Sequence, residues 1–186
     1  MAVQQIAVSG LGGQGVLFVT KLLADTALGA GHSVLISETH GMAQRGGNVI
    51  SHLKISGGAG GGPPLRSPLI RPGKADLLLV LHSDGLSIHG HYLKPGGTLF
   101  CNRSAADPHG AGLGEASVDA NRMAAELGAP VCANLVLLGF AAGSGKLICS
   151  ADMVEATLRD LGGQRGTINL SAFQAGLAEA RQRRWG

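Results

Sequence analysis

Hydrophobic and polar positions along the first hundred residues alternate between strand-like and helix-like spacing. Residues 3–9 (VQQIAVS) predict a first strand. Apolar residues then recur at helical spacing from Gly13 to Ala30, and Gly31 ends the helix. Residues 33–37 predict a second strand, which would complete a strand–helix–strand unit of ordinary length. Residues 48–56 alternate, as expected of a third strand with one buried face and one wetter face.

A segment without periodicity separates this unit from the next strand. Residues 57–73 contain four prolines, which favours a surface loop. The run at 76–81 (DLLLVL), continuously apolar after Asp76, is typical of a strand at the centre of a parallel sheet. We expect a short helix at 84–92, a turn at 95–97 and a further strand at 98–101.

The second half of the chain is mainly helical in pattern after a loop-rich stretch at 102–118. Helices are predicted at 119–128, 133–143, 151–161 and 169–184, with Asp152 and Ser171 as helix-start residues. Residues 162–166 are expected to form a turn, and residues 144–146 a helix end. Alternation of strands and helices predicts an α/β class: one open, Rossmann-like α/β/α domain of three layers, spanning 1–186, with a mostly parallel sheet.

Composition narrows the choice of partners. Glycine contributes 31 of 186 residues, more than twice the usual share of about 7%. Aromatic residues make up only 3%, which argues against a base-stacking nucleic-acid surface. The net charge of +3 owes much to Arg181, Arg183 and Arg184, which we interpret as a solvated helix end. No nucleic-acid partner is expected.

The three cysteines, Cys101, Cys132 and Cys149, are far apart and form no C-x-x-C pair. A disulfide framework, a zinc site and an iron–sulfur site are therefore not expected from this chain alone. No apolar run reaches the roughly 20 residues of a membrane span, and the N-terminus lacks the charged start of a signal peptide. We expect a cytoplasmic protein that does not contact membranes.

Histidines do not form a site that can be recognised in the sequence. His89 and His91 have a spacing that does not align both rings on one helix face, so a solvated pair is predicted. His32, His52, His82 and His109 are isolated in sequence and are expected at the core edge or the surface. No metal site is predicted.

The first candidate binding motif is the run Gly10-Leu11-Gly12-Gly13-Gln14-Gly15, which follows a strand and opens a helix. Glycines there permit a tight turn and let backbone N–H groups meet an anion at the helix N-terminus. The alternative is that they only permit a sharp crossover from strand to helix. Glu38 lies where a ribose-binding acid would be expected, which leaves a nicotinamide site open.

The second candidate is the loop from Glu38 to Gly47, with sequence ETHGMAQRGG. It places an acid, His40 and Arg45 among three glycines at the C-terminal end of a strand, where ligands of open α/β sheets collect. The Arg45 guanidinium could bind a phosphate or carboxylate, and Glu38 could accept from hydroxyls. The alternative is an internal bridge between Glu38 and Arg45 that shapes the loop.

Both glycine motifs, with the Asn48-Val-Ile-Ser-His-Leu strand that follows, resemble the gamma-type subunits of 2-oxoacid:ferredoxin oxidoreductases. The Thr-His-Gly-Met-Ala-Gln-Arg-Gly-Gly run is most similar to the indolepyruvate oxidoreductase beta subunit. The similarity continues through four further segments and covers about residues 4–140: Ser67–Ile70, Ala75–Leu78, Leu93–Gly97 and Asn134–Gly139. Two departures are Asp84-Gly85, where a Glu-Ala pair is typical, and an apparent insertion at 57–64.

The resemblance implies an enzyme that oxidatively decarboxylates a 2-oxoacid, indolepyruvate in the nearest relatives, forms an acyl-CoA and reduces ferredoxin. Thiamine diphosphate and iron–sulfur clusters would belong to a larger partner subunit, and ferredoxin would be reached through the complex. This chain would be the non-redox subunit, inactive alone and without a catalytic residue. CoA would contact the two glycine motifs, through Gly10, Gly12, Gly13, Gln14, Gly15, Glu38, Gly41, Arg45, Gly46 and Gly47. An NAD(P)-dependent oxidoreductase and a ligand-free assembly module are the alternatives.

Overall fold

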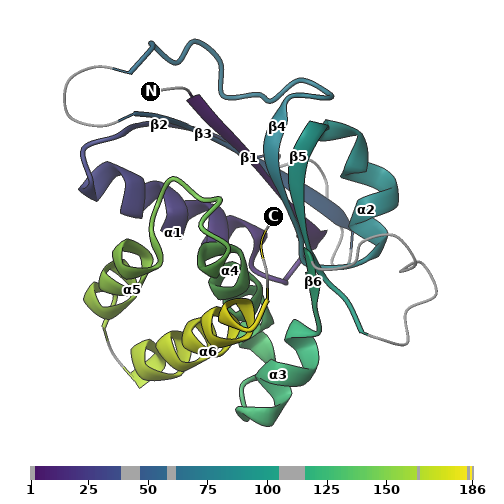
Figure 1. Ribbon diagram of the computed structural model, residues 1–186, viewed down its shortest axis with the longest axis vertical. Helices are drawn as coiled ribbons and strands as arrows, with labels where there is room; N and C mark the ends of the chain where they lie inside the picture. Colours follow the sequence, from purple (N-terminus) through teal and green to yellow (C-terminus); the bar gives the residue numbers. More distant parts are fainter. Residues whose placement is uncertain are drawn as a thin grey trace.

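The structure is a computed structural model that describes residues 3–38, 47–57, 62–104, 116–162, 164–183 and 185. Its centre is a six-stranded sheet with the order β2-β3-β1-β4-β5-β6 (Figure 1). The strands are β1 (Val3–Leu11), β2 (Ser33–Glu38), β3 (Asn48–Ser56), β4 (Ala75–Val80), β5 (Leu93–Asn102) and β6 (Ser117–Val118). Of the six strands, β3 alone runs opposite to the other five, so the predicted α/β class with a mostly parallel sheet is confirmed.

The position of β3 differs from the simplest expectation. Helix α1 (Val16–Gly29) leads from β1 to β2, but β3 lies between these two strands and pairs with both. The prediction of a wetter face on β3 is wrong, because its residues from Ile50 to Leu53 are all buried. An internal strand that is covered on both faces has no solvent-facing side, and alternation in sequence does not reveal this.

The helices cover the two faces of the sheet unequally (Figure 1). The main core joins one face to most of the helices: α1, α3 (Ala120–Glu126), α4 (Ala133–Gly143), α5 (Ala151–Asp160) and α6 (Gln164–Arg181). The other face is covered by the short helices α2 (Asp84–His89) and η1 (Gly90–Tyr92) and by Ile70 of the preceding loop. The third short helix, η4 (Pro130–Cys132), leads into α4.

Helix α4 is the central helix of the larger layer, and it approaches α6 through glycines on both helices. A Cβ atom at Gly139 would lie 1.9 Å from the carbonyl oxygen of Phe173, and one at Gly176 would lie 1.9 Å from that of Val136. The backbones therefore touch at a distance that no other residue allows at either position. This contact fixes α4, whose N-terminus reaches the candidate site.

Three local predictions are corrected by the structure. Pro95, Gly96 and Gly97 lie within β5 and not in a turn before it; Gly96 has φ +73°, and the pairing with β4 shifts register there. Ser150 caps α5 in place of Asp152, because its hydroxyl accepts from the N–H of Met153. Helix α6 begins at Gln164, so residues 164–166 belong to this helix and not to the predicted turn. Ser171, which was predicted to start the helix, lies well inside it. The predicted helix end at 144–146 is confirmed.

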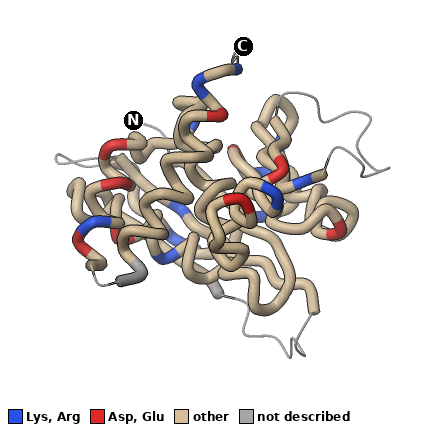
Figure 2. The backbone as a smooth tube through the Cα atoms, turned by 90° about the horizontal axis from the view of Figure 1, so that it is seen from below, with Lys and Arg blue, Asp and Glu red and all other residues tan. Residues whose placement is uncertain are grey.

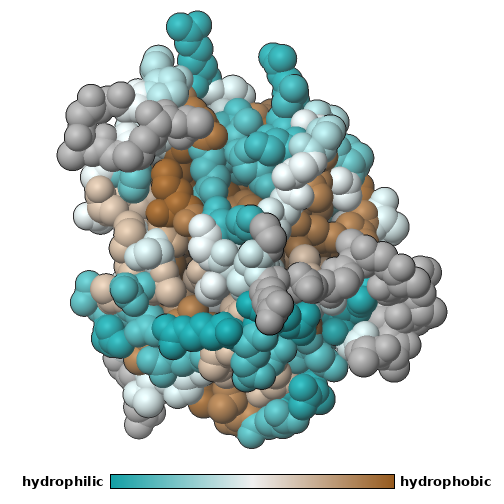
Figure 3. Space-filling model, viewed as in Figure 1, coloured by the Kyte–Doolittle hydropathy of each residue, from teal (hydrophilic) through white to brown (hydrophobic). Residues whose placement is uncertain are grey.

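Charged and hydrophobic residues are both dispersed in the views of Figures 2 and 3. Basic and acidic positions are interspersed in Figure 2, and hydrophobic areas are broken by hydrophilic ones in Figure 3. Within the described ranges, none of the helices is both long enough and apolar enough to cross a bilayer.

Candidate functional site

The candidate site lies at the edge of the sheet where the parallel strands end. The segments that follow β1, β4 and β5 all begin there, and the N–H of Leu81 donates to the carbonyl of Ser9 at 2.7 Å, which joins two of them. The chain leaves β1 into α1 on one face of the sheet and leaves β4 into α2 on the other. Such a change of side between adjacent parallel strands opens a crevice at their carboxyl ends, where α/β proteins bind ligands.

The first glycine motif forms a turn that is held by its own hydrogen bonds. The Gln14 side chain accepts from the N–H of Leu11 at 2.7 Å, and the N–H of Gln14 donates to the carbonyl of Leu11 at 3.1 Å. The N–H of Gly12 donates to the carbonyl of Gly47 at 2.9 Å. Gly12 therefore does not offer its N–H to an anion, which departs from the predicted role, and Gln14 closes the turn from inside.

The remaining glycines of the motif meet geometric demands. Gly10 is part of β1, and a Cβ there would lie 2.9 Å from Oε1 of Gln14. Gly13 and Gly15 have φ values of +97° and +80°, which only glycine adopts readily. Gly15 is the N-cap residue of α1, and a Cβ on it would lie 2.2 Å from Nδ2 of Asn134. The motif is thus needed both for the turn and for close contact with α4.

The second glycine motif is only partly described. The carbonyl of its last residue, Gly47, accepts the hydrogen bond from the N–H of Gly12, so the two motifs meet at the same edge of the sheet. Glu38 is the last residue of β2, but its side chain lies outside the description. Gly41, Arg45, Gly46 and His40 also lie outside the described residues, and their roles remain predictions.

Two cavities adjoin the glycine turn, with volumes of about 270 and 290 Å³. They share Gly13, Gln14, Val131 and Asn134, and we call them together the amide cleft. One extends towards the ends of β4 and β5, and the other towards α1 and α6. The other described lining residues are Leu81, Asn102, Asn121, Pro130 and Ala133 on one side, and Gly15, Phe18, Cys132, Leu135 and Asn169 on the other.

Asparagines organise the amide cleft. Asn102, at the end of β5, donates to the carbonyl of Leu81 and to Oδ1 of Asn121, both at 3.0 Å, and accepts from the N–H of Ala120 at 2.9 Å. This buried side chain ties β4, β5 and the start of α3 together. Oδ1 of Asn134 accepts from the N–H of Leu135 at 2.8 Å. The sequence analysis did not identify these asparagines as site residues. The one available signal is Asn134, a polar residue in an otherwise apolar helical run.

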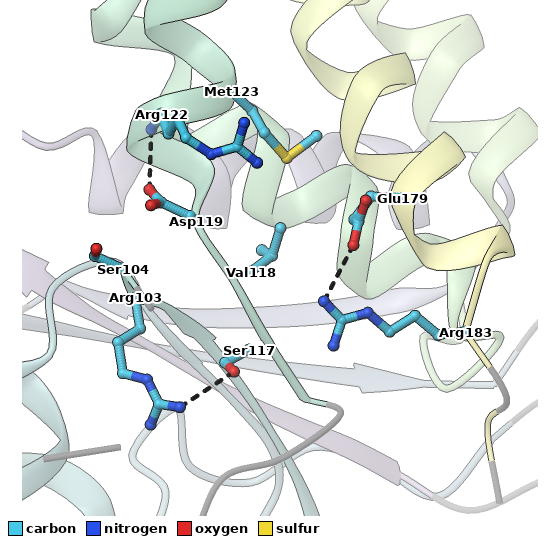
Figure 4. Close-up of a pocket in the computed structure, with 9 residues that line it drawn as sticks. All are labelled: Arg103, Ser104, Ser117, Val118, Asp119, Arg122, Met123, Glu179 and Arg183. Carbon is cyan, nitrogen blue, oxygen red and sulfur yellow. Dashed lines mark hydrogen bonds and ion pairs between the residues drawn. The ribbon is translucent and has the colours of Figure 1, made fainter. Parts of the chain in front are cut away.

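A third cavity, of about 350 Å³, differs in chemistry because charged side chains line it (Figure 4). Arg183 pairs with Glu179 at 3.1 Å, and the carboxylate of Asp119 caps α3 by accepting from the N–H of Arg122 at 3.0 Å. Arg103 donates to Ser117 at 3.5 Å, while its buried Nη1 has no partner in the described part of the chain. Acids offset much of the positive charge, so an anion would have to compete with existing pairs.

Histidines meet on the opposite face of the sheet, contrary to the sequence prediction. Tyr92 has its ring centroid 5.1 Å from that of His52 and 4.4 Å from that of His91, and Nδ1 of His89 lies 2.7 Å from the Ser9 hydroxyl. Burial lowers the pKa of His52, with a smaller effect of His89 and Lys54. Burial also lowers the pKa of His89, with a smaller effect of His91. These residues pack α2 and the segment after it against the sheet, and they do not line the amide cleft.

Cysteines and acids do not converge on a metal site in the parts of the chain that are described. All three cysteines are buried, and burial raises the pKa of the Cys132 thiol and raises that of Cys149 to about 11. For Cys132 and Cys149 this disfavours the thiolate form, which is the form that binds a metal.

Comparison with known sequences finds relatives over nearly the whole chain. An indolepyruvate oxidoreductase subunit IorB from Pyrococcus horikoshii is 29% identical, and the match covers 95% of this chain and 96% of the relative. The subunit of the same name from Archaeoglobus fulgidus is 28% identical, with 94% of each chain covered.

Solved structures with the same fold include the gamma subunit of a keto/oxoacid ferredoxin oxidoreductase from Geobacter sulfurreducens. It has a TM-score of 0.77 and 24% identity, covering 97% of this chain and 99% of that one. A 2-oxoglutarate:ferredoxin oxidoreductase from Magnetococcus marinus, solved with 2-oxoglutarate, coenzyme A and succinyl-CoA, has a TM-score of 0.81 and 20% identity; this chain spans only 32% of its length. The family described as pyruvate ferredoxin/flavodoxin oxidoreductase matches residues 5–179. The chain therefore belongs to the pyruvate ferredoxin/flavodoxin oxidoreductase family.

Proposed function

We propose that the chain is the small, non-redox subunit of a 2-oxoacid:ferredoxin oxidoreductase, with indolepyruvate as the 2-oxoacid. The observation that carries the proposal is the match to indolepyruvate oxidoreductase subunits over 95% of this chain and 96% of the Pyrococcus subunit. The similarity thus extends over nearly the whole length of both chains.

The chemistry of the chain supports a division of labour within the complex. Its three cysteines are buried, so electrons would pass through iron–sulfur clusters of a larger partner. That partner would also hold thiamine diphosphate, and the complex would pass electrons to ferredoxin. The role of this chain is then to complete the assembly and to bind part of the CoA substrate.

The glycine turn and the amide cleft are the parts of the chain that would contact CoA. They lie at the carboxyl edge of the parallel strands, and Gly12 and Gly47 join the two glycine motifs there. The Magnetococcus enzyme, which has the same fold in part of its chain, was solved with CoA bound. Arg45 would contribute a guanidinium to the phosphates, since its planar fork suits bidentate contacts.

Reconstitution tests the subunit assignment. The purified chain should be colourless and should not reduce a viologen dye with any 2-oxoacid. Co-expression with a partner that carries thiamine diphosphate and clusters should give dye reduction that depends on both indolepyruvate and CoA. Turnover by the isolated chain would contradict the proposal.

The nicotinamide alternative predicts a different ligand response. CoA, added to the assembled complex at about 100 times its dissociation constant, should stabilise it by about 2.7 kcal/mol, whereas NADH should have no effect. Stabilisation by NADH alone would favour the dehydrogenase reading, and stabilisation by neither would favour the assembly module.

A further inference from the structure

The amide cleft contains hydrogen-bond donors that the protein does not use itself. Nδ2 of Asn121, Asn134 and Asn169 donates to no protein group within the described chain, although an oxygen of each side chain accepts a hydrogen bond. Asn134 is only 8% exposed as a residue, but its Nδ2 is not fully enclosed and stays accessible from the cleft that it lines. A ligand with carbonyl oxygens would satisfy these donors.

The described residues that line the cleft carry no positive charge that would favour binding of a phosphate. None of its described lining residues is ionised at neutral pH, since burial raises the pKa of the Cys132 thiol and the others have neutral side chains. The Gly12 N–H, which would face a diphosphate in a nucleotide-binding turn, donates to Gly47 instead. A phosphate would lose its hydration here without a cation to compensate.

Apolar side chains at the cleft complete its chemical character. Val131 is 87% exposed and Phe18 is 38% exposed, which is unusual for large apolar residues next to a cavity. Methyl and methylene groups of a ligand would cover them. The cleft therefore suits a slender, uncharged ligand segment that alternates amide groups with short apolar stretches.

We propose that the amide cleft receives the pantetheine arm of CoA, and that the phosphates of CoA lie outside it. The arm consists of two amide groups joined by methylene and methyl-bearing carbons, which matches the donors and the apolar rim. Asn134 has two roles: it contacts Gly15 and so positions the turn, and its Nδ2 donates to an amide carbonyl of the arm. This inference rests on the proposed CoA contact and adds which part of CoA is bound.

Isosteric substitutions in the reconstituted complex can distinguish binding of the pantetheine arm from binding of the nucleotide and phosphates of CoA. Asn134→Asp and Asn121→Asp replace a donor with a carboxylate oxygen that repels a ligand carbonyl. Asn121 is exposed, so its variant folds even if the charge at Asn134 proves disruptive. Gln182→Glu, at an exposed position outside the cleft, makes the same chemical change as a control. The kcat/KM is measured with CoA and with pantetheine as acyl acceptors, and gel filtration checks assembly.

The proposal predicts that each cleft variant lowers kcat/KM about tenfold for CoA and for pantetheine alike, because the lost contact lies in the part they share. The control should change neither value. A loss with CoA but not with pantetheine would place the phosphates or the nucleotide in the cleft and overturn the inference, while the CoA contact would stand. Unchanged values for both acceptors in an assembled complex would overturn the CoA contact as well.

Discussion

The hydroxyl oxygen of Ser9 lies 2.7 Å from Nδ1 of His89, although the two residues are 80 positions apart. Gly85 makes this contact sterically feasible, since a Cβ there would lie 2.5 Å from the Ser9 hydroxyl. An alanine at this position, which the resemblance to the family leads us to expect, would crowd the same hydroxyl. The glycine at position 85 thus has a packing explanation: α2 lies close enough to β1 for its last residue to bond with a buried serine.

Stability should depend on pH through the histidines under α2. His52 and His89 both have a lowered pKa in the folded chain, chiefly because burial disfavours their charged forms. The unfolded chain therefore binds more protons below about pH 6.5, where free histidine titrates. Stability should be complete above about pH 6.5 and should fall as the pH drops towards the folded pKa values. Urea unfolding between pH 7.5 and 5 measures this dependence.

A substitution of His52 isolates its share of that dependence. His52 is 3% exposed and packs edge-on against Tyr92, so His52→Phe keeps an aromatic ring and removes the titrating group. The loss of stability on acidification should be smaller in this variant than in the native protein. An unchanged pH dependence in His52→Phe would show that His52 does not contribute.

The close contact between α4 and α6 predicts that alanine substitutions at two glycines of α6 change stability in opposite directions. Gly176→Ala would bring a Cβ within 1.9 Å of the Val136 carbonyl, whereas a Cβ at Gly166 meets no atom within 4 Å. Gly176→Ala should lower the free energy of unfolding by about 1–3 kcal/mol or more, and Gly166→Ala should raise it by about 0.4–1 kcal/mol. Chemical denaturation of both variants provides the comparison, and equal stabilities would refute the close packing.

Arg45→Lys tests the predicted anion contact of the second glycine motif, which lies outside the described residues. Lysine keeps the charge but loses the planar fork. If Arg45 binds a CoA phosphate, CoA-dependent turnover of the reconstituted complex should fall about ten- to a hundredfold, because a charge-assisted bond contributes about 1.5–3 kcal/mol. Subunit association should stay near normal. Loss of association with unchanged CoA affinity would make the loop an interface element, and no change in either would make Arg45 a surface residue.

The thiols should be unreactive in the folded chain. Cys149 is buried and burial raises its pKa to about 11, so at pH 8 on the order of one in a thousand molecules carries the reactive thiolate. Labelling with a thiol reagent should be slow in buffer and should reach all three cysteines in denaturant. Rapid labelling of Cys149 in buffer would mean that its surroundings open readily.

Local patterns predicted the elements well, because period and punctuation are local properties of the chain. The run at 76–81 is a buried central strand as expected, and Gly31 follows the end of α1. The order of strands was not predictable, since insertion of β3 between β1 and β2 depends on contacts distant in sequence. The same reason hid the histidine cluster, in which His52 and His89 come together only through the pairing of β3 with β1 and the docking of α2.

The sequence predicted the position of the glycine turn better than the hydrogen bonds within it. The glycine run does form a turn at the carboxyl edge of the sheet, as the motif indicates. What the motif could not show is that the Gly12 N–H donates to Gly47 of the second motif and that the Gln14 side chain accepts from the N–H of Leu11. The asparagines of the amide cleft come from β5, α3, α4 and α6, so only the folded chain brings them together.

Hydrogen exchange of the reconstituted complex, followed by mass spectrometry with and without CoA, tests the central claim most directly. Amides of this chain in peptides covering residues 11–18 and 130–135 should exchange more slowly with CoA, because the ligand covers the glycine turn and the start of α4. Peptides from α5, which does not line the cleft, should exchange at the same rate in both samples. Protection that appears only in the partner subunit, with the 11–18 and 130–135 peptides unchanged, would contradict a CoA contact by this chain.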